Sequence, residues 1–234
     1  PRAQAPQLRI AVDIGGTFTD MAAFDEATGQ LLFGKALSTH GELVKGIQST
    51  IDSAHIDWRD GNLFLHGSTI AINTLLERNG ANTALLITEG FRDIYEIGRV
   101  NRPDAYNLFF NKHQPLVKRS LRYEVAERLR ADGSTHKPLD EAAVRELAKD
   151  LRGQGIEAVA VLLLHSYRNP AHEQRVKQIL QEEIPGAFVC ASHELSQEYR
   201  EFERVSTAVA NAYVGPRVSE YLGQLEDHLS GQGF

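Results

Sequence analysis

The stretch "RIAVDIGGTFTD", Arg9 to Asp20, constrains the fold of this chain more than any other. An apolar run ends in an acid, two adjacent glycines follow, and an apolar segment with a second acid comes next. Leu8 to Ile14 and Phe18 to Phe24 are typical of strands, and Gly15-Gly16 marks the turn between them. The chain is therefore predicted to open with two antiparallel strands.

The rest of the chain continues this meander and then alternates helices with buried strands. Turn formers in "DEATGQ" precede a third predicted strand, Leu31 to Ala36. Apolar spacing predicts helices over Glu42–Ile56, Ser68–Arg78, Asp140–Arg152, Ala171–Glu183 and Glu201–His228, the last interrupted at Gly215-Pro216. Further strands are predicted over Asn62–His66, Thr83–Thr88, Ser120–Leu129, Glu157–His165 and Ala187–Ala191. This order predicts an α/β fold in which helices flank a mixed sheet.

Composition excludes several classes of function. The net charge is −6 and the basic residues are scattered, so no basic face is available to bind a nucleic-acid backbone. No apolar run approaches the roughly 20 residues that a membrane span needs. Cys190 is the single cysteine, so no internal disulfide forms and a reducing, cytoplasmic location fits best.

The glycines after the first strand are suited to binding phosphate. Converging backbone N–H groups hold a phosphate, and glycine leaves no Cβ in the way. Thr17 and Thr19 add hydroxyl donors, while Asp13 could hold a Mg²⁺-bound water or orient an attacking water. A tight hairpin without a ligand is the structural alternative.

Several long segments resemble one family. "DIGGTFTD" resembles the first phosphate loop of the sugar kinase, Hsp70 and actin superfamily, in the form found in the hydantoinase A/5-oxoprolinase family. That family includes related subunits of acetone and acetophenone carboxylases. The segments "HGSTIAINTLLERNGANTALLITEGFRDIYEIGR", "NRPDAYNL", "SYRNPAHE" and "EYREFERVSTAVANAYVGP" are similar to family segments as well. The resemblance covers nearly the whole chain.

This resemblance implies a ribonuclease H-like, actin-type lobe with a mixed five-stranded sheet, opened by the meander. It implies a lobe over residues 8–200 and the start of a following helical domain over 201–234, because family members are longer and carry a second phosphate loop. ATP and Mg²⁺ are the implied cofactors, and a hydantoinase B-type subunit or domain is the implied partner. The implied site residues are Asp13, His66 and Asn73 for catalysis, Asp13 for the metal, and Gly15, Gly16, Thr17, Thr19 and Asp20 for the nucleotide.

The implied activity is ATP-dependent ring opening of a cyclic amide through phosphorylation of its carbonyl oxygen. A ketone carboxylase subunit is the close alternative, because it uses the same phosphate chemistry. A nucleotide-dependent assembly module without small-molecule chemistry is the alternative from another class.

His66, Thr69 and Asn73 are the second candidate group. His66 begins "HGST" at a predicted strand-to-helix junction, and Thr69 and Asn73 share one helix face. The structural alternatives are that His66 is a hydrogen-bonded residue at a strand end and that Asn73 packs in a helix.

Other motifs favour structural interpretations. "GQLLFGKA" nearly spells a Walker A loop, but Ala36 replaces the Ser or Thr, so a hairpin is expected. His172-Glu173 and His193-Glu194 lack the second histidine of a zinc-protease motif and are interpreted as surface positions. Cys190 is expected to be buried and structural.

Four positions have open interpretations. Arg99 and Arg102 flank a loop that could reach a substrate or a partner, although solvated charges are the alternative. Glu203-Arg204 is interpreted as a solvated face or an interdomain ion pair.

Overall fold

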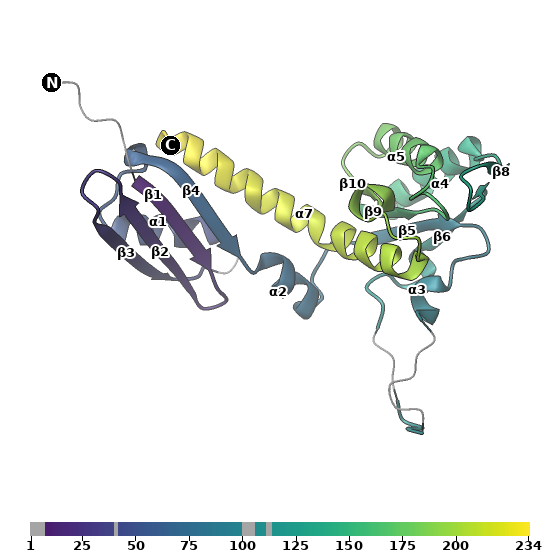
Figure 1. Ribbon diagram of the computed structural model, residues 1–234, viewed down its shortest axis with the longest axis horizontal. Helices are drawn as coiled ribbons and strands as arrows, with labels where there is room; N and C mark the ends of the chain where they lie inside the picture. The colour runs from purple at the N-terminus through teal and green to yellow at the C-terminus, as the bar shows by residue number, and fades with distance from the viewer. Residues whose placement is uncertain (1–7, 40–41, 100–105, 111–113) are drawn as a thin grey trace. The chain divides into compact units, whose positions relative to one another are not determined.

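The computed structural model describes residues 8–39, 42–99, 106–110 and 114–234 (Figure 1). These residues form two compact units. The first comprises the described residues up to Leu76 together with Arg217–Phe234, and the second comprises Glu77–Pro216. The first unit is therefore interrupted in sequence by the whole of the second.

The first unit is built on a mixed four-stranded sheet in the order β3-β2-β1-β4. Its strands are β1 (Leu8–Ile14), β2 (Phe18–Asp25), β3 (Leu31–Leu37) and β4 (Gly61–Ser68). β1 to β3 form an antiparallel meander, and β4 runs parallel to β1. The predicted meander is confirmed, with Asp13 paired to Asp20 and Ile14 to Thr19.

Only one face of this sheet is buried. Ile10, Val12 and Ile14 on β1 are buried, whereas the residues between them are exposed. The inner face packs against α1 (Leu43–Ser53) and against Tyr221 and Leu225 of α7 (Glu201–Gln232). This strict alternation is the burial pattern of a sheet covered on one side.

The second unit holds a parallel four-stranded sheet in the order β10-β9-β5-β6. Its strands are β5 (Thr83–Thr88), β6 (Arg122–Val125), β9 (Ala158–Leu162) and β10 (Phe188–Ala191). One face packs on α4 (Glu141–Gly153) and α5 (Ala171–Glu183), and the other packs on the first half of α7. The remaining elements are α2 (Ile70–Glu77), α3 (Ile94–Ile97), α6 (Ser192–Leu195), the 3₁₀ turns η1 (Trp58–Asp60) and η2 (Arg119–Leu121), and the ribbon β7 (Arg128–Leu129) with β8 (Thr135–Lys137).

The α/β class is confirmed, but the single five-stranded sheet is wrong. Every residue of β5 and β9 is buried, so both faces of these strands need cover, and helices on both sides provide it. They therefore form a sheet of their own instead of extending the opening one.

The predicted interruption of the last helix is also wrong, since α7 continues through Pro216. Gly215 serves packing there: a Cβ atom on it would lie 2.4 Å from Cε1 of Phe188. Among the described helices, none combines the length and the apolar character needed to cross a bilayer.

Candidate functional site

The turn between β1 and β2 is held by its own backbone. The Gly15 N–H donates to the Phe18 carbonyl at 3.0 Å, and a Cβ atom on Gly15 would lie 3.2 Å from that same oxygen. Gly16 differs, because a Cβ atom there would meet nothing within 4 Å and its φ is not positive. Neither packing nor backbone conformation therefore requires glycine at position 16.

Ser38, just after β3, binds the carbonyl side of this turn. Its hydroxyl donates to the Gly15 carbonyl at 2.8 Å, and its N–H donates to the Thr17 carbonyl at 2.9 Å. Within the described residues, the N–H groups of Gly16 and Thr17 have no backbone or side-chain acceptor. The turn thus presents two available N–H donors next to an open Cβ position, which is the arrangement that an anion requires.

Asp13 lies on the exposed face of the sheet beside this turn. Its strand partner Asp20 lies on the same face and is paired to Lys35 at 2.8 Å. No partner from the described parts of the chain bonds to the Asp13 carboxylate. The neighbouring position on β4 is Gly67, whose Cβ position lies 3.0 Å from Oδ1 of Asp13. The Asp13 carboxylate therefore lies between Asp20 on β2 and Gly67 on β4, which has no side chain.

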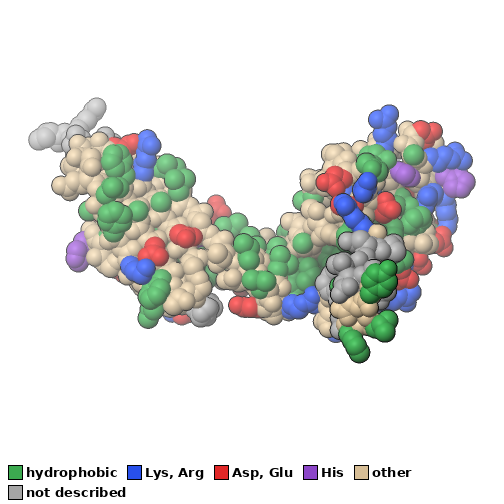
Figure 2. Space-filling model, turned by 60° about the horizontal axis from the view of Figure 1, so that its bottom comes forward, with side chains coloured by type: hydrophobic (Ala, Val, Ile, Leu, Met, Phe, Trp, Pro, Cys, Tyr) green, Lys and Arg blue, Asp and Glu red, His purple; other side chains and the backbone are tan. Residues whose placement is uncertain are grey.

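This face carries an open hollow of about 790 Å³. It is lined by the charged residues Asp13, Asp20 and Lys35, together with Ala11, Val12, Met21, Ala22, Phe33, Gly34, Leu65, His66 and Gly67. Figure 2 shows hydrophobic, acidic and basic side chains exposed together on one side of this unit. The lining of the hollow combines apolar residues with a few charged ones, a combination typical of small-molecule sites.

The predicted site residues divide between the two faces of the sheet. Asp13, Gly16, Thr17 and Asp20 are exposed. Thr19 is 1% exposed and its hydroxyl bonds to that of Ser38 at 3.1 Å, so it is not available at the surface. His66 points to the inner, packed face, where Nε2 lies 2.6 Å from the Tyr221 hydroxyl.

The predicted Thr69–Asn73 pair is present on α2 and the residue before it. The Asn73 amide donates to the Thr69 hydroxyl at 3.2 Å, and that hydroxyl donates to the Ile14 carbonyl at 3.3 Å. Thr69 thus contacts the last residue of β1, and neither Thr69 nor Asn73 lines the hollow. A direct catalytic role for His66 and Asn73 stays a prediction.

The exposed group suits a phosphate with a divalent cation. The N–H groups of Gly16 and Thr17, which have no acceptor in the part of the chain that the structure describes, and the hydroxyl of Thr17 would hold phosphate oxygens. Mg²⁺ in nucleotide sites keeps most of its waters and takes one or two carboxylates. Asp13 provides such a carboxylate. No cluster of three or more metal-binding side chains occurs among the described residues, so the protein ligands alone would not form a complete cage.

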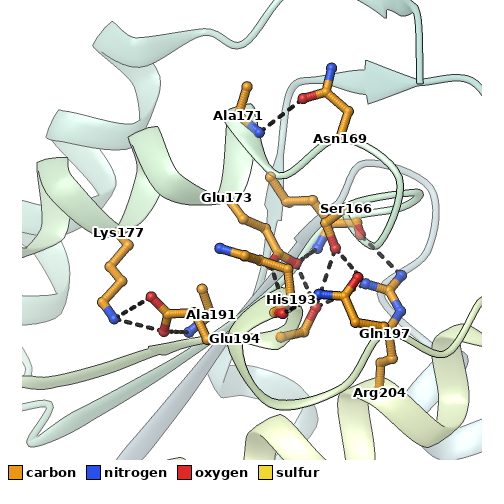
Figure 3. A network of polar contacts seen from close by, with 12 residues as sticks. Ser166, Asn169, Ala171, Glu173, Lys177, Ala191, His193, Glu194, Gln197 and Arg204 are labelled. Carbon is orange, nitrogen blue, oxygen red and sulfur yellow. Dashed lines mark hydrogen bonds and ion pairs between the residues drawn. The ribbon is translucent and has the colours of Figure 1, made fainter.

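The second unit contains a buried polar network at the carboxyl ends of β9 and β10 (Figure 3). Glu173 is fully buried and accepts bonds from Leu163 N, Ser192 Oγ, His193 N and His193 Nδ1. Arg204, 1% exposed, donates to Ser166, Ser192 and the Leu163 carbonyl. The expectation of surface positions is therefore wrong for Glu173 and His193, because the carboxylate organises the loops after two strands.

The remaining candidates have structural environments. Cys190 is buried, donates to the Ala208 carbonyl, and has its pKa raised by burial to about 11, so the expected inert thiol is confirmed. The Walker-like segment forms β3, as expected. Arg99 pairs with Glu203 inside the second unit, and Arg204 is buried rather than solvated. Arg102 lies outside the described residues.

Sequence reasoning did not find Ser38 or Tyr221. Ser38 belongs to no motif, although its position one residue after a predicted strand returning to the glycine turn was a usable signal. Tyr221 is separated from His66 by 155 positions and occurs within a long helical pattern. Nothing in one sequence indicates that contact.

Several proteins with assigned names or solved structures are similar to this chain. Over 94% of this chain, caprolactamase subunit alpha of Pseudomonas jessenii is 36% identical. Its solved structure gives a TM-score of 0.83 over 96% of the chain and 34% of its own length, at 34% identity. The nucleotide-free structure of acetone carboxylase gives 0.85 over 97% of the chain and 35% of its own length, at 26% identity.

A further relative is acetophenone carboxylase gamma subunit of Aromatoleum aromaticum, 33% identical over 96% of this chain and 33% of its own length. The chain spans about a third of the length of the curated relatives it matches. The model of the hydantoinase/oxoprolinase N-terminal region matches residues 9–184, which is most of the chain. The chain therefore belongs to the hydantoinase/oxoprolinase N-terminal family.

Proposed function

We propose that this chain is the N-terminal part of an ATP-dependent enzyme that opens cyclic amides, and that residues 8–200 belong to an actin-type lobe with a phosphate-binding turn. The observation that carries the proposal is Gly16. Neither packing nor backbone conformation requires glycine there, yet among the described residues nothing accepts from its N–H or bonds to the carboxylate of the nearby Asp13. Relatives named caprolactamase and 5-oxoprolinase support the choice of a cyclic amide.

ATP would supply the phosphoryl group that activates the amide carbonyl oxygen and makes the C–N bond hydrolysable. The N–H groups of Gly16 and Thr17, with the Thr17 hydroxyl, hold phosphate oxygens. Asp13 would hold a Mg²⁺-bound water or would orient the attacking water. Asp20, paired to Lys35, keeps a second negative charge beside Asp13 and favours binding of a cation there.

The alternative is a ketone carboxylase subunit in which ATP activates the ketone and bicarbonate. The acetone carboxylase structure and the acetophenone carboxylase relative favour this alternative. Both reactions need the same phosphate turn, and substrate assays separate them.

A partner subunit belongs to the proposal, because relatives are named as alpha, beta and gamma subunits. We propose a hydantoinase B-type subunit or domain in this role. We also place the protein in the cytoplasm, because the free buried thiol of Cys190 suits a reducing compartment.

The test measures phosphate release by the full-length protein with its partner subunit. Caprolactam, hydantoin and 5-oxoproline are compared with acetone and acetophenone plus bicarbonate. Release that depends on a cyclic amide, with ring-opened product, supports the proposal. Release that depends on a ketone supports the carboxylase. ATP hydrolysis indifferent to all of these would leave only a nucleotide-dependent module.

A further inference from the structure

Asp13, the central carboxylate of the proposed site, has a hydrogen-bonded support behind it. Its two neighbours on β1 are Val12 and Ile14, whose side chains point to the inner face. The Val12 carbonyl lies 3.2 Å from Nδ1 of His66, and the Ile14 carbonyl accepts from the Thr69 hydroxyl at 3.3 Å. The carbonyl groups of the residues before and after Asp13 are thus bonded to side chains from one neighbouring segment, residues 66–69.

Each of these two donors is fixed by a further residue. The Asn73 amide donates to the Thr69 hydroxyl at 3.2 Å. The Tyr221 hydroxyl lies 2.6 Å from Nε2 of His66, and the Phe64 ring stacks on the imidazole with an interplanar angle of 12°. Two series of hydrogen bonds therefore reach the backbone around Asp13, one from α2 and one from α7.

The chemistry of the His66 contacts assigns its tautomer. A carbonyl can only accept, so Nδ1 must carry the proton that goes to Val12. Nε2 is then the acceptor for the Tyr221 hydroxyl. Burial raises the pKa of Tyr221 to about 12, which keeps that hydroxyl protonated as a donor. Burial also lowers the pKa of His66, which keeps the imidazole neutral, although the Val12 carbonyl and the Asp13 charge act in the opposite direction.

We infer that Tyr221 is a positioning residue, which acts through the His66 tautomer to fix the end of β1 and with it the Asp13 carboxylate. This inference deepens the proposed function and rests on it for the role of Asp13. Tyr221 does not itself line the hollow, and its hydroxyl reaches the site only through His66, in the packed core on the inner face of the sheet. Its effect passes through the backbone alone.

Tyr221→Phe is the direct test, because it removes the hydroxyl and keeps the ring against His66. Without that donor, the imidazole is free to protonate Nε2 and give up the Val12 bond. Tyr123→Phe is the matched control: Tyr123 also donates a hydroxyl bond, to Gln154 at 3.0 Å, but in the second unit.

The first readout does not depend on turnover. In the 234-residue chain, ¹⁵N spectra of the imidazoles and ¹³C spectra of the carboxyl groups follow His66 and Asp13 directly. Tyr221→Phe should convert His66 from the Nδ1–H form to a mixture, raise its midpoint of titration, and shift the Asp13 carboxyl signal. Tyr123→Phe should change none of these. An unchanged His66 tautomer or an unchanged Asp13 signal in Tyr221→Phe overturns the inference.

The second readout is steady-state kinetics of the full-length enzyme with its partner. Tyr221→Phe should lower kcat about tenfold, the scale of one hydrogen bond, with little change in KM for ATP. The acid limb of its pH profile should move to higher pH. An unchanged kcat overturns the inference even if His66 changes its tautomer.

Thr69→Val provides a second variant without a titrating group. It keeps the β-branched shape and removes the hydroxyl behind Ile14, so kcat should fall with no movement of the acid limb. The same movement of the acid limb in Thr69→Val would mean that His66 does not cause it, which contradicts the inference. If the His66 and Asp13 spectra of Tyr221→Phe change as expected but the full-length protein shows no ATP-dependent turnover, the proposed function is refuted and the link from Tyr221 to Asp13 stands.

Discussion

A Cβ atom on Gly67 would lie 3.0 Å from Oδ1 of Asp13, across the parallel pair of β1 and β4. Gly67→Ala should therefore displace the carboxylate by a few tenths of an ångström, because its end is free to move. We expect kcat of the full-length enzyme to fall about 10- to 100-fold, since small displacements at a reacting centre have effects of that size. Stability should change little.

Gly186→Ala is the control for this substitution. It is the same chemical change at a position where a Cβ atom meets nothing within 4 Å. Equal kcat values for the two variants and the wild type would show that the site tolerates a moved Asp13.

Gly16→Val should separate binding from folding. Position 16 has room for a side chain and no positive φ, so thermal melts should match the wild type. A side chain there would occupy the space next to the free N–H groups, and ATP-dependent turnover should drop by about 10²-fold or more. Full turnover in this variant would remove the phosphate role of the turn.

Asp13→Asn keeps the shape of the side chain and removes its charge. The expected loss in kcat is about 10²–10⁴-fold, the usual effect of losing one electrostatic or acid–base contribution. The melting temperature should hold or rise slightly, because Asp20 lies directly opposite on β2 and the two carboxylates repel. A melt that collapses without a specific kinetic defect would make Asp13 a structural residue.

Gly34→Ala tests a glycine that packing requires. A Cβ atom there would lie 2.2 Å from the Thr50 carbonyl oxygen, so β3 and α1 would have to separate. We expect the free energy of unfolding to fall by about 1–3 kcal/mol or more, measured by denaturant titration. Gly153→Ala, at the end of α4 with open space around its Cβ position, should be neutral or stabilising. Equal stability in both variants would contradict this close approach.

Acid should weaken the folded state through His66. Burial lowers the pKa of this imidazole from 6.5. Between the lowered pKa and 6.5, the unfolded chain takes up a proton that the folded chain does not, so the free energy of unfolding falls as the pH drops through this window. His66→Gln should show a shallower fall below pH 6.5 in denaturant titrations at fixed pH. An identical slope in the variant would contradict the burial of a neutral imidazole.

The opening sheet was predictable because its signals are local. Alternating burial in β1, turn formers before β3 and the glycine pair each act over a few residues. The second sheet was harder to place. The continuous apolar runs of β5 and β9 indicate that both faces of these strands are buried, but they do not indicate to which sheet the strands belong.

The positions of the predicted site residues could be read from the sequence only in part, for a similar reason. Asp13 and Gly16 follow from the end of a strand and a turn. The positions of Thr19 and His66 depend on which face of the sheet each side chain occupies, and therefore on Ser38 and Tyr221. The burial of Glu173 and Arg204 is not indicated by the sequence, because composition does not reveal the hydrogen bonds that reach these two side chains from separate loops.

The division of the chain has a consequence for biosynthesis. Tyr221 and Leu225 belong to the core of the first unit but follow the last residue of the second. During translation the glycine turn emerges early, yet its supporting layer stays incomplete until the last part of this sequence leaves the ribosome. Glu77–Pro216 is contiguous in sequence, so the second unit can fold before Arg217–Phe234, which completes the first unit, has been synthesised. A nascent chain stopped before position 217 would contain the whole glycine turn without Tyr221 to bond to His66.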